Sequence, residues 1–562
     1  MRYAFLVAAG SLLAGCATSP PPSIGEAAPV ASFDWLDYSG TNPLPAPRPG
    51  EYRNPILQGF YPDPSITRVG DDYYLVTSTF SWFPGIPIFH SRDLVSWTQI
   101  GNAIHRPEQL DFAKLGLSRG VFAPDISYHN GLFYILNTCV DCGGNFLITA
   151  RHPKGPWSDP VWLPEIEGGI DPSLFFDEDG LAWILNNGPP VGTPRYDGHR
   201  AIWIQRFDVQ AQKMVGPRKV LIDGGIDPST KPIWIEGPHI FRKDGFYYLT
   251  AAEGGTAEGH SQVILRSRTV DGPYEVGPRN PILTQRDLPR ERANPITSAG
   301  HADLVETAAG EWWASFLAVR PYQGDFYNTG RETFLLPVTW LDGWPQITAP
   351  GQAIPVVHKR PKVPAQAAAA VPMNGAFRVR EEFNGKALPP SWMTMRNPRE
   401  SWYSLSGGKL ELEARPVGLG DFGNPSLLAR RQQHTDALAT TRVTFAPRQA
   451  GDEAGLVALQ NDEYWFFLAV GMENGRRVLT LKRRGGAGDP KDGVTVASVP
   501  LAEAGAVDLR IEARGGRYDF SYAGRSGQWR TLRAGEDGTI LSTKTAGGFV
   551  GAVFGLHAKA AR

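Results

Sequence analysis

The chain has 562 residues, too many for a single hydrophobic core, so at least two domains are expected. Glycine (63 residues), proline (48 residues) and aromatic residues (11%) are abundant, a composition typical of turn-rich all-β architecture. Lys and Arg (56 residues) nearly balance Asp and Glu (57 residues), and the formal net charge is -1. Because binding phosphate groups requires a basic excess or stripe, nucleic acid is excluded as a partner.

The N-terminus has the pattern of an exported bacterial protein. Arg2 precedes an apolar run over residues 4–13, and this charged start with a short apolar core defines a secretory signal. The motif Leu-Ala-Gly-Cys16 resembles a bacterial lipobox, in which the cysteine is lipidated. We therefore expect a signal peptide over residues 1–16 and a tether over residues 17–49. Ala17 indicates an outer-membrane lipoprotein of the cell envelope, facing the periplasm or the cell surface, and an ordinary signal peptide is the alternative.

One phrase of aromatic and β-branched residues, introduced by glycine or an acid, occurs five times. Its copies begin roughly 50 to 65 residues apart, close to the length of a four-stranded propeller blade with its loops. We therefore expect a five-bladed β-propeller over residues 50–347, in which each copy is an inner strand beside an axial funnel. The copies occupy residues 72–79, 131–138, 180–187, 245–252 and 311–318.

Cys139 and Cys142 stand in a C-x-x-C spacing just after the second copy. A zinc site would need a second pair or histidines at metal-ligand spacing, and none follows in the sequence. In an exported chain this spacing indicates a local disulfide or two unpaired thiols, and both interpretations stay open.

The composition changes after the fifth copy. Residues 348–378 are rich in proline and alanine and are interpreted as a linker. Over residues 379–562 apolar and polar residues alternate between turn signals, which predicts a β-sandwich. The G-x-G-x-x-G motif at residues 418–423 lacks a surrounding βαβ unit, so it is interpreted as a loop and not as a nucleotide site.

Acidic residues precede several copies of the repeat. Asp63 lies between two prolines, which restrict its backbone, and a turn-capping role is an equal alternative for it. Asp171 belongs to the phrase Gly-Gly-Ile-Asp-Pro-Ser and leads into an apolar strand, whereas Asp227, in the same phrase, leads into Thr-Lys-Pro and is interpreted as a loop acid. Glu236 follows an apolar triplet, and such surroundings raise the pKa of a carboxyl group, as a general acid requires.

The phrases Pro-Asp63-Pro-Ser, Ile-Asp171-Pro-Ser and Glu236-Gly-Pro-His, in this order, resemble glycoside hydrolase family 43. The resemblance covers residues 54–344 and is to the β-xylosidase and α-L-arabinofuranosidase members, many of which carry a similar second domain. It implies that Asp63 is the general base that activates water and Glu236 the general acid. Asp171 is implied to tune the pKa of Glu236 and to orient it, and the reaction is implied to invert the anomeric configuration.

The same resemblance implies roles for two further residues of the funnel. Arg331 would hydrogen-bond the sugar in the terminal subsite, and a salt bridge with Glu332 or Glu306 is the alternative. His301 would be a histidine that holds a central calcium ion in some relatives, directly or through water. A buried neutral histidine bonded to the backbone is the alternative for His301.

Aromatic residues are implied to form the pocket wall. Phe80 and Phe122 match wall positions, although related β-xylosidases often carry tryptophan in place of Phe122, which leaves the sugar preference open. In relatives the sandwich also lends an aromatic residue to the active site, and Phe549 and Phe422 are both candidates. Because a wet site weakens electrostatic contacts, we expect the sandwich to pack on the propeller and close the pocket.

Together these expectations describe an exo-acting inverting glycosidase. Its substrates would be xylan-derived oligosaccharides or arabinoxylan side chains, from which it would release terminal β-D-xylose or α-L-arabinofuranose. No cofactor is required for this chemistry, and a structural calcium ion is left open. An endo-arabinanase and a non-catalytic glycan-binding propeller are the alternatives; an open cleft would not need the sandwich, and a binding module would gain little from three acids.

Overall fold

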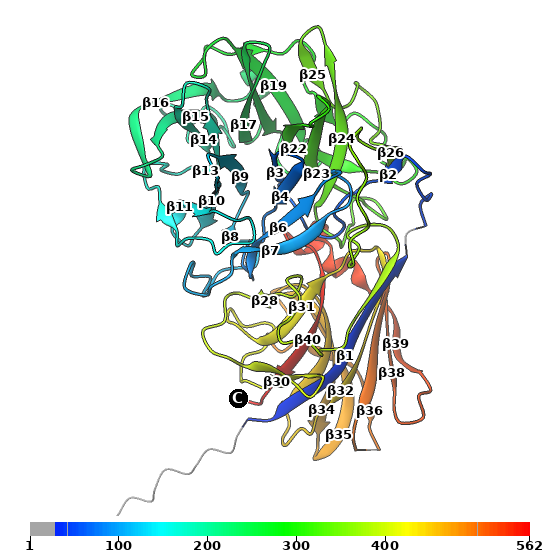
Figure 1. Ribbon diagram of the computed structural model, residues 1–562. Coiled ribbons are helices and arrows are strands. Elements are labelled where there is room, and N and C mark those ends of the chain that lie inside the picture. Colours follow the sequence, from blue (N-terminus) through cyan, green and yellow to red (C-terminus); the bar gives the residue numbers. More distant parts are fainter. Residues whose placement is uncertain (1–27, 42, 503) are drawn as a thin grey trace, which may run out of the picture.

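The structure is a computed structural model that describes residues 28–41, 43–502 and 504–562. It contains a propeller and, below it in Figure 1, a sandwich of two sheets. Its helical segments are short: η1 (Pro228–Thr230), η2 (Gly538–Leu541) and α1 (Thr543–Ala546). Within this described part, no helix is long and apolar enough to cross a membrane. The predicted signal peptide and Cys16 lie outside the described residues.

Five antiparallel sheets form the blades of the propeller, which confirms the predicted architecture. Blade 1 runs from the axis outward as β3 (Ser65–Val69), β4 (Asp72–Val76), β6 (Gly85–Ser91) and β7 (Thr98–Ile104). Blade 2 contains β9 (Asp125–His129), β10 (Leu132–Val140), β11 (Gly144–Ala150) and β12 (Val161–Trp162). Blade 3 contains β13 (Ile170–Phe176), β14 (Ala182–Gly188), β15 (Ala201–Asp208) and β16 (Lys213–Asp223). Blade 4 contains β17 (Glu236–Lys243), β18 (Phe246–Glu253), β19 (Ser261–Ser267) and β20 (Glu275–Val276). Blade 5 contains β22 (Thr297–Glu306), β23 (Trp312–Val319), β24 (Glu332–Leu341) and β25 (Trp344–Gln346).

The repeated phrases form the second strand of each blade and not the innermost one, which corrects the sequence interpretation. β10 and β23 are buried along nearly their whole length, because neighbouring blades cover both faces. Strands covered on both faces are apolar in runs instead of alternating. The acidic phrases instead begin the innermost strands, since β13 starts one residue before Asp171 and β17 starts at Glu236.

Two segments from opposite ends of the propeller sequence close the ring. β2 (Glu51–Arg53) pairs with β26 (Val357–Lys359), so part of the predicted linker belongs to the propeller. The Asn54 side chain donates to the carbonyl oxygen of Leu335 at 2.9 Å and accepts from its backbone N–H at 2.9 Å. These bonds join the start of blade 1 to the third strand of blade 5.

The second domain is the predicted β-sandwich, with its core between two sheets. In β37, Val507, Leu509, Ile511 and Ala513 are buried and alternate with more exposed residues, as period-two spacing predicts. One sheet contains β29 (Tyr403–Ser406), β30 (Lys409–Glu413), β1 (Val30–Thr41), β32 (Asp436–Thr444), β37 (Val507–Arg514), β38 (Arg517–Ala523) and β39 (Arg530–Asp537), with β27 (Phe377–Glu381) beside β1. The other contains β31 (Ser426–Arg431), β40 (Val553–Lys559), β33 (Glu453–Asn461), β34 (Tyr464–Glu473), β35 (Arg476–Gly485) and β36 (Val494–Pro500).

Residues 30–41, expected in the tether, form β1 in the middle of this sheet, which corrects the predicted domain boundary. β1 pairs with β27, β30 and β32, and its Phe33, Leu36 and Tyr38 side chains are buried in the sandwich core. The blue strand that crosses the lower domain in Figure 1 is this segment. The chain therefore contributes to the sandwich before it forms the propeller and returns afterwards to complete it.

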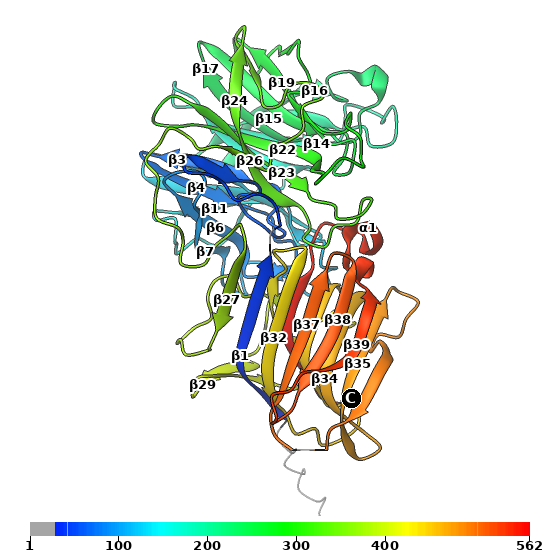
Figure 2. The ribbon, with the colours of Figure 1, turned by 90° about the vertical axis from the view of Figure 1, so that its right-hand side faces the viewer.

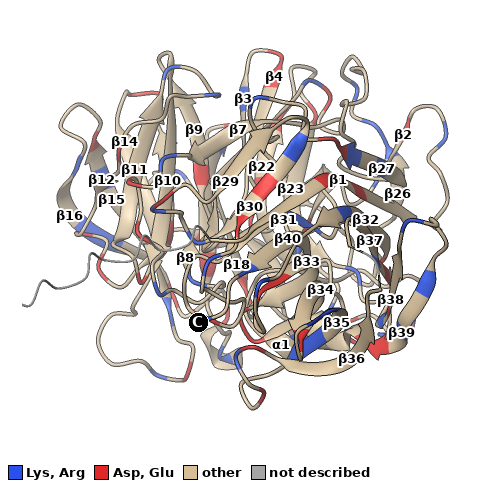
Figure 3. Cartoon of the chain, turned by 90° about the horizontal axis from the view of Figure 1, so that it is seen from below, with Lys and Arg blue, Asp and Glu red and all other residues tan. Residues whose placement is uncertain are grey.

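The two domains share a packed interface, as predicted. β28 (Thr394–Met395) of the sandwich side pairs with β5 (Trp82–Phe83) of the propeller. Around this pairing, apolar residues of both domains form one buried cluster, which includes Phe60, Trp82, Trp465 and Val550. Figure 2 shows the upper end of the sandwich, with α1, against the lower side of the propeller. Seen from below, acidic and basic residues alternate along the ribbon without a long run of either sign (Figure 3).

Candidate active site

A cavity of about 360 Å³ lies at the end of the propeller axis that the sandwich covers. The three acids singled out in the sequence, Asp63, Asp171 and Glu236, come from three different blades and all line this cavity. Each is less than a tenth exposed. The other lining residues are Phe80, Arg119, Phe122, Ala123, Ile170, Trp234, Gly255, Thr256, His301, Arg331 and Phe549.

A common backbone turn directs side chains to the axis. Asp63 and Asp171, near the starts of β3 and β13, and His301, in the middle of β22, take positive φ values of 55°, 52° and 53°. Residues other than glycine seldom adopt this conformation, which costs roughly 1–3 kcal/mol and persists only where the surroundings hold it. Its recurrence in three blades places strained backbone around the pocket, where function resides in many proteins.

Asp63 is held as a carboxylate. The Arg331 guanidinium donates to its Oδ1 at 2.8 Å and to its Oδ2 at 3.4 Å, and the Ser78 hydroxyl donates to Oδ2 at 2.6 Å. Burial raises the pKa of Asp63, but Arg331, His301 and Ser78 outweigh burial, and the pKa lies below its ordinary value. Asp63 is therefore ionised at neutral pH and able to accept a proton.

Glu236 and Asp171 have the opposite electrostatic environment. Burial, together with the charges of Asp171 and Asp63, raises the pKa of Glu236 well above its ordinary value. Burial and the charge of Asp63 likewise raise the pKa of Asp171 to about 7, although the Gly237 N–H donates to its Oδ2 at 3.2 Å. The two carboxyl groups thus retain a proton between them near neutral pH. One pocket therefore combines a carboxylate base with a protonated acid, as general acid and base catalysis requires.

Aromatic rings from both domains form one wall of the cavity. Phe549, from the loop after α1, stacks on Phe80 at 5.8 Å between ring centroids and meets Phe122 edge-on at 5.7 Å. The Arg331 guanidinium lies 5.3 Å from the centroid of the Phe549 ring. Phe422, the other candidate, is 50% exposed and does not line the cavity. The structure therefore identifies Phe549 as the sandwich residue that reaches the pocket.

The residues around His301 do not fit a protein-held calcium ion. Burial lowers the pKa of His301 to about 4, so its ring is neutral, and its Nδ1 lies 3.7 Å from Asp63 Oδ1. Calcium takes six to eight oxygen ligands, whereas the carboxylate beside His301 is already bound by Arg331. Among the described residues, the one cluster of three potential metal ligands does not include His301. His301 is thus buried and neutral, and a calcium ion held through water stays a prediction.

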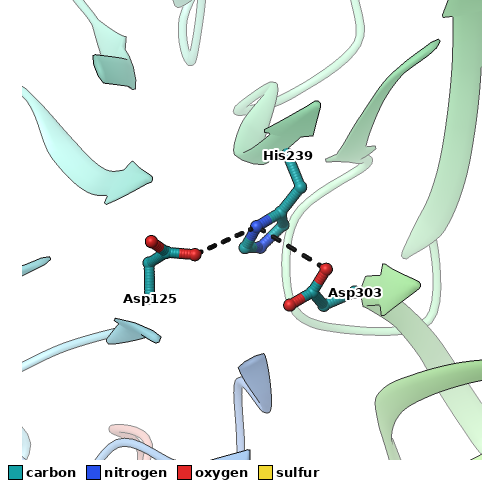
Figure 4. Close-up of side chains that lie close together, drawn as sticks. All are labelled: Asp125, His239 and Asp303. Carbon is teal, nitrogen blue, oxygen red and sulfur yellow. Dashed lines mark ion pairs between the residues drawn. The ribbon is translucent and has the colours of Figure 1, made fainter. Parts of the chain in front are cut away.

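That cluster is formed by Asp125, His239 and Asp303 of three innermost strands (Figure 4). The His239 ring lies between the two carboxylates, with Nδ1 at 3.4 Å from Asp125 Oδ1 and 3.8 Å from Asp303 Oδ1. Burial opposes protonation, but Asp303 and Asp125 outweigh it and raise the pKa of His239 to about 9. The protonated ring pairs with both carboxylates, so the cluster forms an ionic cross-link between blades.

The cross-link fixes strands that carry pocket residues. Ser65 Oγ and the Ile66 N–H of blade 1 both donate to Asp303 Oδ2 at 2.9 Å, and the Leu174 N–H of blade 3 donates to Asp125 Oδ2 at 2.9 Å. All five blades are therefore joined at the axis. His239 stands three residues after Glu236 on β17, so the same strand is held at the cross-link and presents the acid to the pocket.

Comparison with known proteins agrees with this site. Residues 52–345 match the family model described as glycosyl hydrolases family 43, and residues 380–561 match the beta xylosidase C-terminal concanavalin A-like domain. The chain belongs to glycoside hydrolase family 43. The family members are inverting glycoside hydrolases, and the two matched regions coincide with the propeller and with the larger part of the sandwich.

Relatives within the family are similar over nearly the whole chain. A xylosidase/arabinosidase of Butyrivibrio fibrisolvens is 38% identical over 508 residues, which cover 90% of this chain and 95% of that protein. A non-reducing end alpha-L-arabinofuranosidase of Bacteroides ovatus is 36% identical, covering 90% and 91%. A crystal structure of a GH43_12 protein from a capybara gut metagenome superposes with a TM-score of 0.87 at 39% identity, covering 94% of this chain and 100% of that one.

Several sequence interpretations can now be compared with the structure. Asp227 is exposed and caps η1, accepting from the Ser229 N–H, as expected of a loop acid. Arg331 pairs with neither Glu332 nor Glu306; it binds Asp63, and Glu332 pairs with Arg320 instead. Arg331 thus holds the predicted general base.

The two thiols after the second repeat are joined. Cys139 and Cys142 form a disulfide, the first of the two alternatives for this pair.

Sequence reasoning missed two residues of the active site. Ser78, which orients Asp63, gave no signal beyond membership of the family-like segment, and Trp234 was interpreted only as an apolar neighbour of Glu236.

The coupling between Asp171 and Glu236 predicts a pH effect. Asp171→Asn removes one charge that raises the pKa of Glu236, so that pKa should fall and the acid should lose its proton at lower pH. We expect the alkaline limb of the pH profile of kcat/KM for an unactivated disaccharide to move down by about one pH unit or more. The acidic limb, set by Asp63, should stay in place. An unmoved alkaline limb in a folded, active variant would show that Asp171 does not tune Glu236.

Proposed function

We propose that this protein removes terminal β-D-xylose or α-L-arabinofuranose, with inversion, from xylan-derived oligosaccharides or arabinoxylan side chains. The observation that carries the proposal is the opposite ionisation of Asp63 and Glu236 in one pocket. The names of the relatives, which include xylosidases, arabinosidases and an alpha-L-arabinofuranosidase, support the choice of sugars.

The mechanism follows from the protonation states. Asp63 accepts a proton from a water molecule, whose oxygen attacks the anomeric carbon as the glycosidic C–O bond breaks. Glu236 gives its proton to the leaving oxygen, so that a neutral alcohol departs. Asp171 keeps the pKa of Glu236 high enough for this donation. Arg331 and Ser78 hold the Asp63 carboxylate in place and leave it ionised. No step in this scheme uses a metal ion or cofactor.

The dimensions of the pocket favour action on chain ends. A volume of about 360 Å³ is at the small end of the range for ligand pockets and suits one terminal sugar. Phe549 of the sandwich covers one side, where an endo-arabinanase would need an open cleft for a continuous chain. A non-catalytic binding module would have no use for a buried acid kept protonated beside a carboxylate.

Product stereochemistry tests the proposal. Purified enzyme is given nitrophenyl β-D-xyloside and nitrophenyl α-L-arabinofuranoside, and the substrate that is cleaved is then followed by proton NMR. Because Asp63 acts on water and not on the sugar, the first product should be the inverted anomer, visible before mutarotation mixes the signals. A retained anomer would contradict the roles assigned to the acids, and cleavage of neither glycoside would contradict the proposed substrates.

We further propose that the protein is an outer-membrane lipoprotein anchored through Cys16. The support is the signal-like N-terminus with its lipobox-like motif. Such an anchor would place the enzyme where pentose oligosaccharides arrive at the cell envelope. A lipoprotein with several acyl chains is held firmly, whereas one chain alone binds a membrane weakly.

Replacing the lipidated thiol tests the anchor. Cys16→Ser should abolish incorporation of labelled palmitate and move the protein from the membrane fraction to the soluble fraction. Cys139→Ser removes a different thiol and should leave lipidation intact. Labelled lipid on the Cys16→Ser protein, or its firm membrane retention without lipid, would refute the anchor.

A further inference from the structure

Trp234 connects the catalytic cavity with a neighbouring depression. It stands two residues before Glu236 and lines the catalytic cavity together with the acids. It also lines an open cavity of about 500 Å³, whose other walls are residues 194–200. The two cavities share this one residue, so Trp234 stands between them.

The indole is unusual in its exposure and its backbone. Trp234 is 38% exposed, although large apolar residues are mostly buried in this chain. Its φ is 47°, a conformation that is a genuine outlier for a bulky side chain. The backbone N–H of Trp234 donates to the carbonyl oxygen of Gly198 at 2.9 Å, which helps to hold the turn. Strained backbone that presents an aromatic ring to solvent beside a catalytic acid points to a functional role.

Arg200 holds the ring in place. Its guanidinium carbon lies 4.7 Å from the centroid of the Trp234 ring system, within cation–π distance. Arg200 is itself fixed, because Nε and Nη2 donate to Asn187 Oδ1 at 3.0 and 2.7 Å and Nη2 donates to the Gly168 carbonyl at 2.6 Å. The indole is therefore a preorganised surface, which lowers the entropic cost of binding a ligand to it.

Position and charge define the ligand class. Glu236 protonates the leaving oxygen, so a residue beside it faces the leaving-group side of the scissile bond. Pyranose rings have an apolar C–H face that packs on aromatic rings while the hydroxyls remain in water. The two guanidinium groups of the neighbouring cavity are already bonded, Arg195 to Asp223 and Arg200 to Asn187, which favours a neutral sugar over an acidic one.

We infer that Trp234 is the platform of a leaving-group subsite, which takes the neutral pyranose unit next to the cleaved bond. This inference rests on the proposed function and extends it. The terminal pentose occupies the catalytic cavity, and the sugar that departs stacks on Trp234 in the neighbouring one. Trp234 therefore selects substrates by the unit attached to the terminal sugar, and it favours oligosaccharides over small glycosides.

The test compares substrates with and without a leaving-group sugar. The wild type, Trp234→Ala and Trp234→Phe are assayed on two substrates of the pentose that the enzyme prefers: the trisaccharide in which that pentose is joined to xylobiose, and its glycosyl fluoride. For Trp234→Ala we expect KM for the trisaccharide to rise about tenfold or more, while kcat and the kcat/KM for the fluoride change less than about threefold. Trp234→Phe keeps an aromatic face and should lie between. Trp162→Ala is the matched control, since this tryptophan is 41% exposed on β12 and lines neither cavity.

Each outcome of this test either supports or overturns the role of Trp234 as a platform. Equal losses on trisaccharide and fluoride would overturn the platform, because Trp234 would then act on the terminal-sugar site or on the fold. A loss in kcat alone for the trisaccharide, with the fluoride unaffected, would mean that Trp234 acts through the acid Glu236 and would overturn the platform too. Unchanged KM for the trisaccharide would overturn it as well. If the wild type cleaves neither substrate, the proposed function itself fails. This result differs from a loss of activity that is seen only in the variants, on one substrate or on both.

Discussion

Asp63→Asn is expected to lower kcat/KM about 10²- to 10⁴-fold on every substrate, whatever its leaving group. The amide cannot accept a proton from water, and attack by water is needed for good and poor leaving groups alike. Asparagine keeps the volume of the side chain and can still accept from Ser78, so the buried site should remain folded. Thermal unfolding of the variant checks that the loss is chemical and not structural.

Glu236→Gln should divide substrates by leaving group. An unactivated disaccharide needs a proton on its leaving oxygen and should lose about 10²- to 10⁴-fold in kcat/KM, whereas an aryl glycoside of an acidic phenol should lose far less. The measurement is the ratio of the two losses. Equal losses would remove the assignment of Glu236 as the acid.

Asp227 provides the matched control for these variants. It stands in the same Gly-Gly-Ile-Asp-Pro-Ser phrase as Asp171, yet it is exposed and bonded within its own loop. Asp227→Asn should change kcat/KM by no more than about twofold, because exposed sites away from the pocket tolerate substitution. Sequence similarity between the two phrases therefore does not determine function, whereas position relative to the axis does.

The number of blades could be predicted because the second strands are long, apolar and evenly spaced. Apart from the apolar end of β13, the innermost strands were not recognised, because they are marked by proline, glycine and polar residues that resemble loop sequence. β17, for example, begins Glu-Gly-Pro-His. The location of β1 was not predictable for a different reason. Its alternation predicts a strand, but its partner β32 lies beyond the whole propeller in sequence, and local patterns do not specify such pairings.

The three acids could be predicted from their motifs, whereas their ionisation depends on contacts between distant residues. Arg331 binds Asp63 across 268 positions of sequence. The choice of Phe549 over Phe422 likewise depends on a contact between domains. The Phe549 N–H donates to Ser118 Oγ at 2.8 Å, and a Cβ at Gly548 would stand 2.2 Å from that oxygen. Only glycine allows this approach. The Gly-Gly-Phe phrase is therefore a signal for the contact, but it can be interpreted only when the propeller surface beside it is known.

Phe549→Ala tests whether the sandwich contributes to catalysis. Removing the ring opens the wall formed with Phe80 and Phe122 and takes away one of the cation–π partners of Arg331, which also lies over Phe80. Water would then reach the pocket and weaken the contacts between Arg331 and Asp63. With aromatic and cation–π contacts worth roughly 0.5–1.5 kcal/mol each, we expect kcat/KM on short substrates to fall about 10- to 100-fold.

Phe422→Ala is the control for this variant, because Phe422 is a half-exposed phenylalanine of the same domain that packs on Arg396 and lines no part of the pocket. It should keep kcat/KM within about twofold of the wild type. The main-chain bond from Phe549 to Ser118 survives the Phe549→Ala change, and the partly exposed ring leaves only a small cavity, so the domains should stay docked. If folded Phe549→Ala protein retains full kcat/KM, the sandwich supports the propeller without taking part in the reaction. A loss confined to this variant assigns catalysis to the two domains jointly.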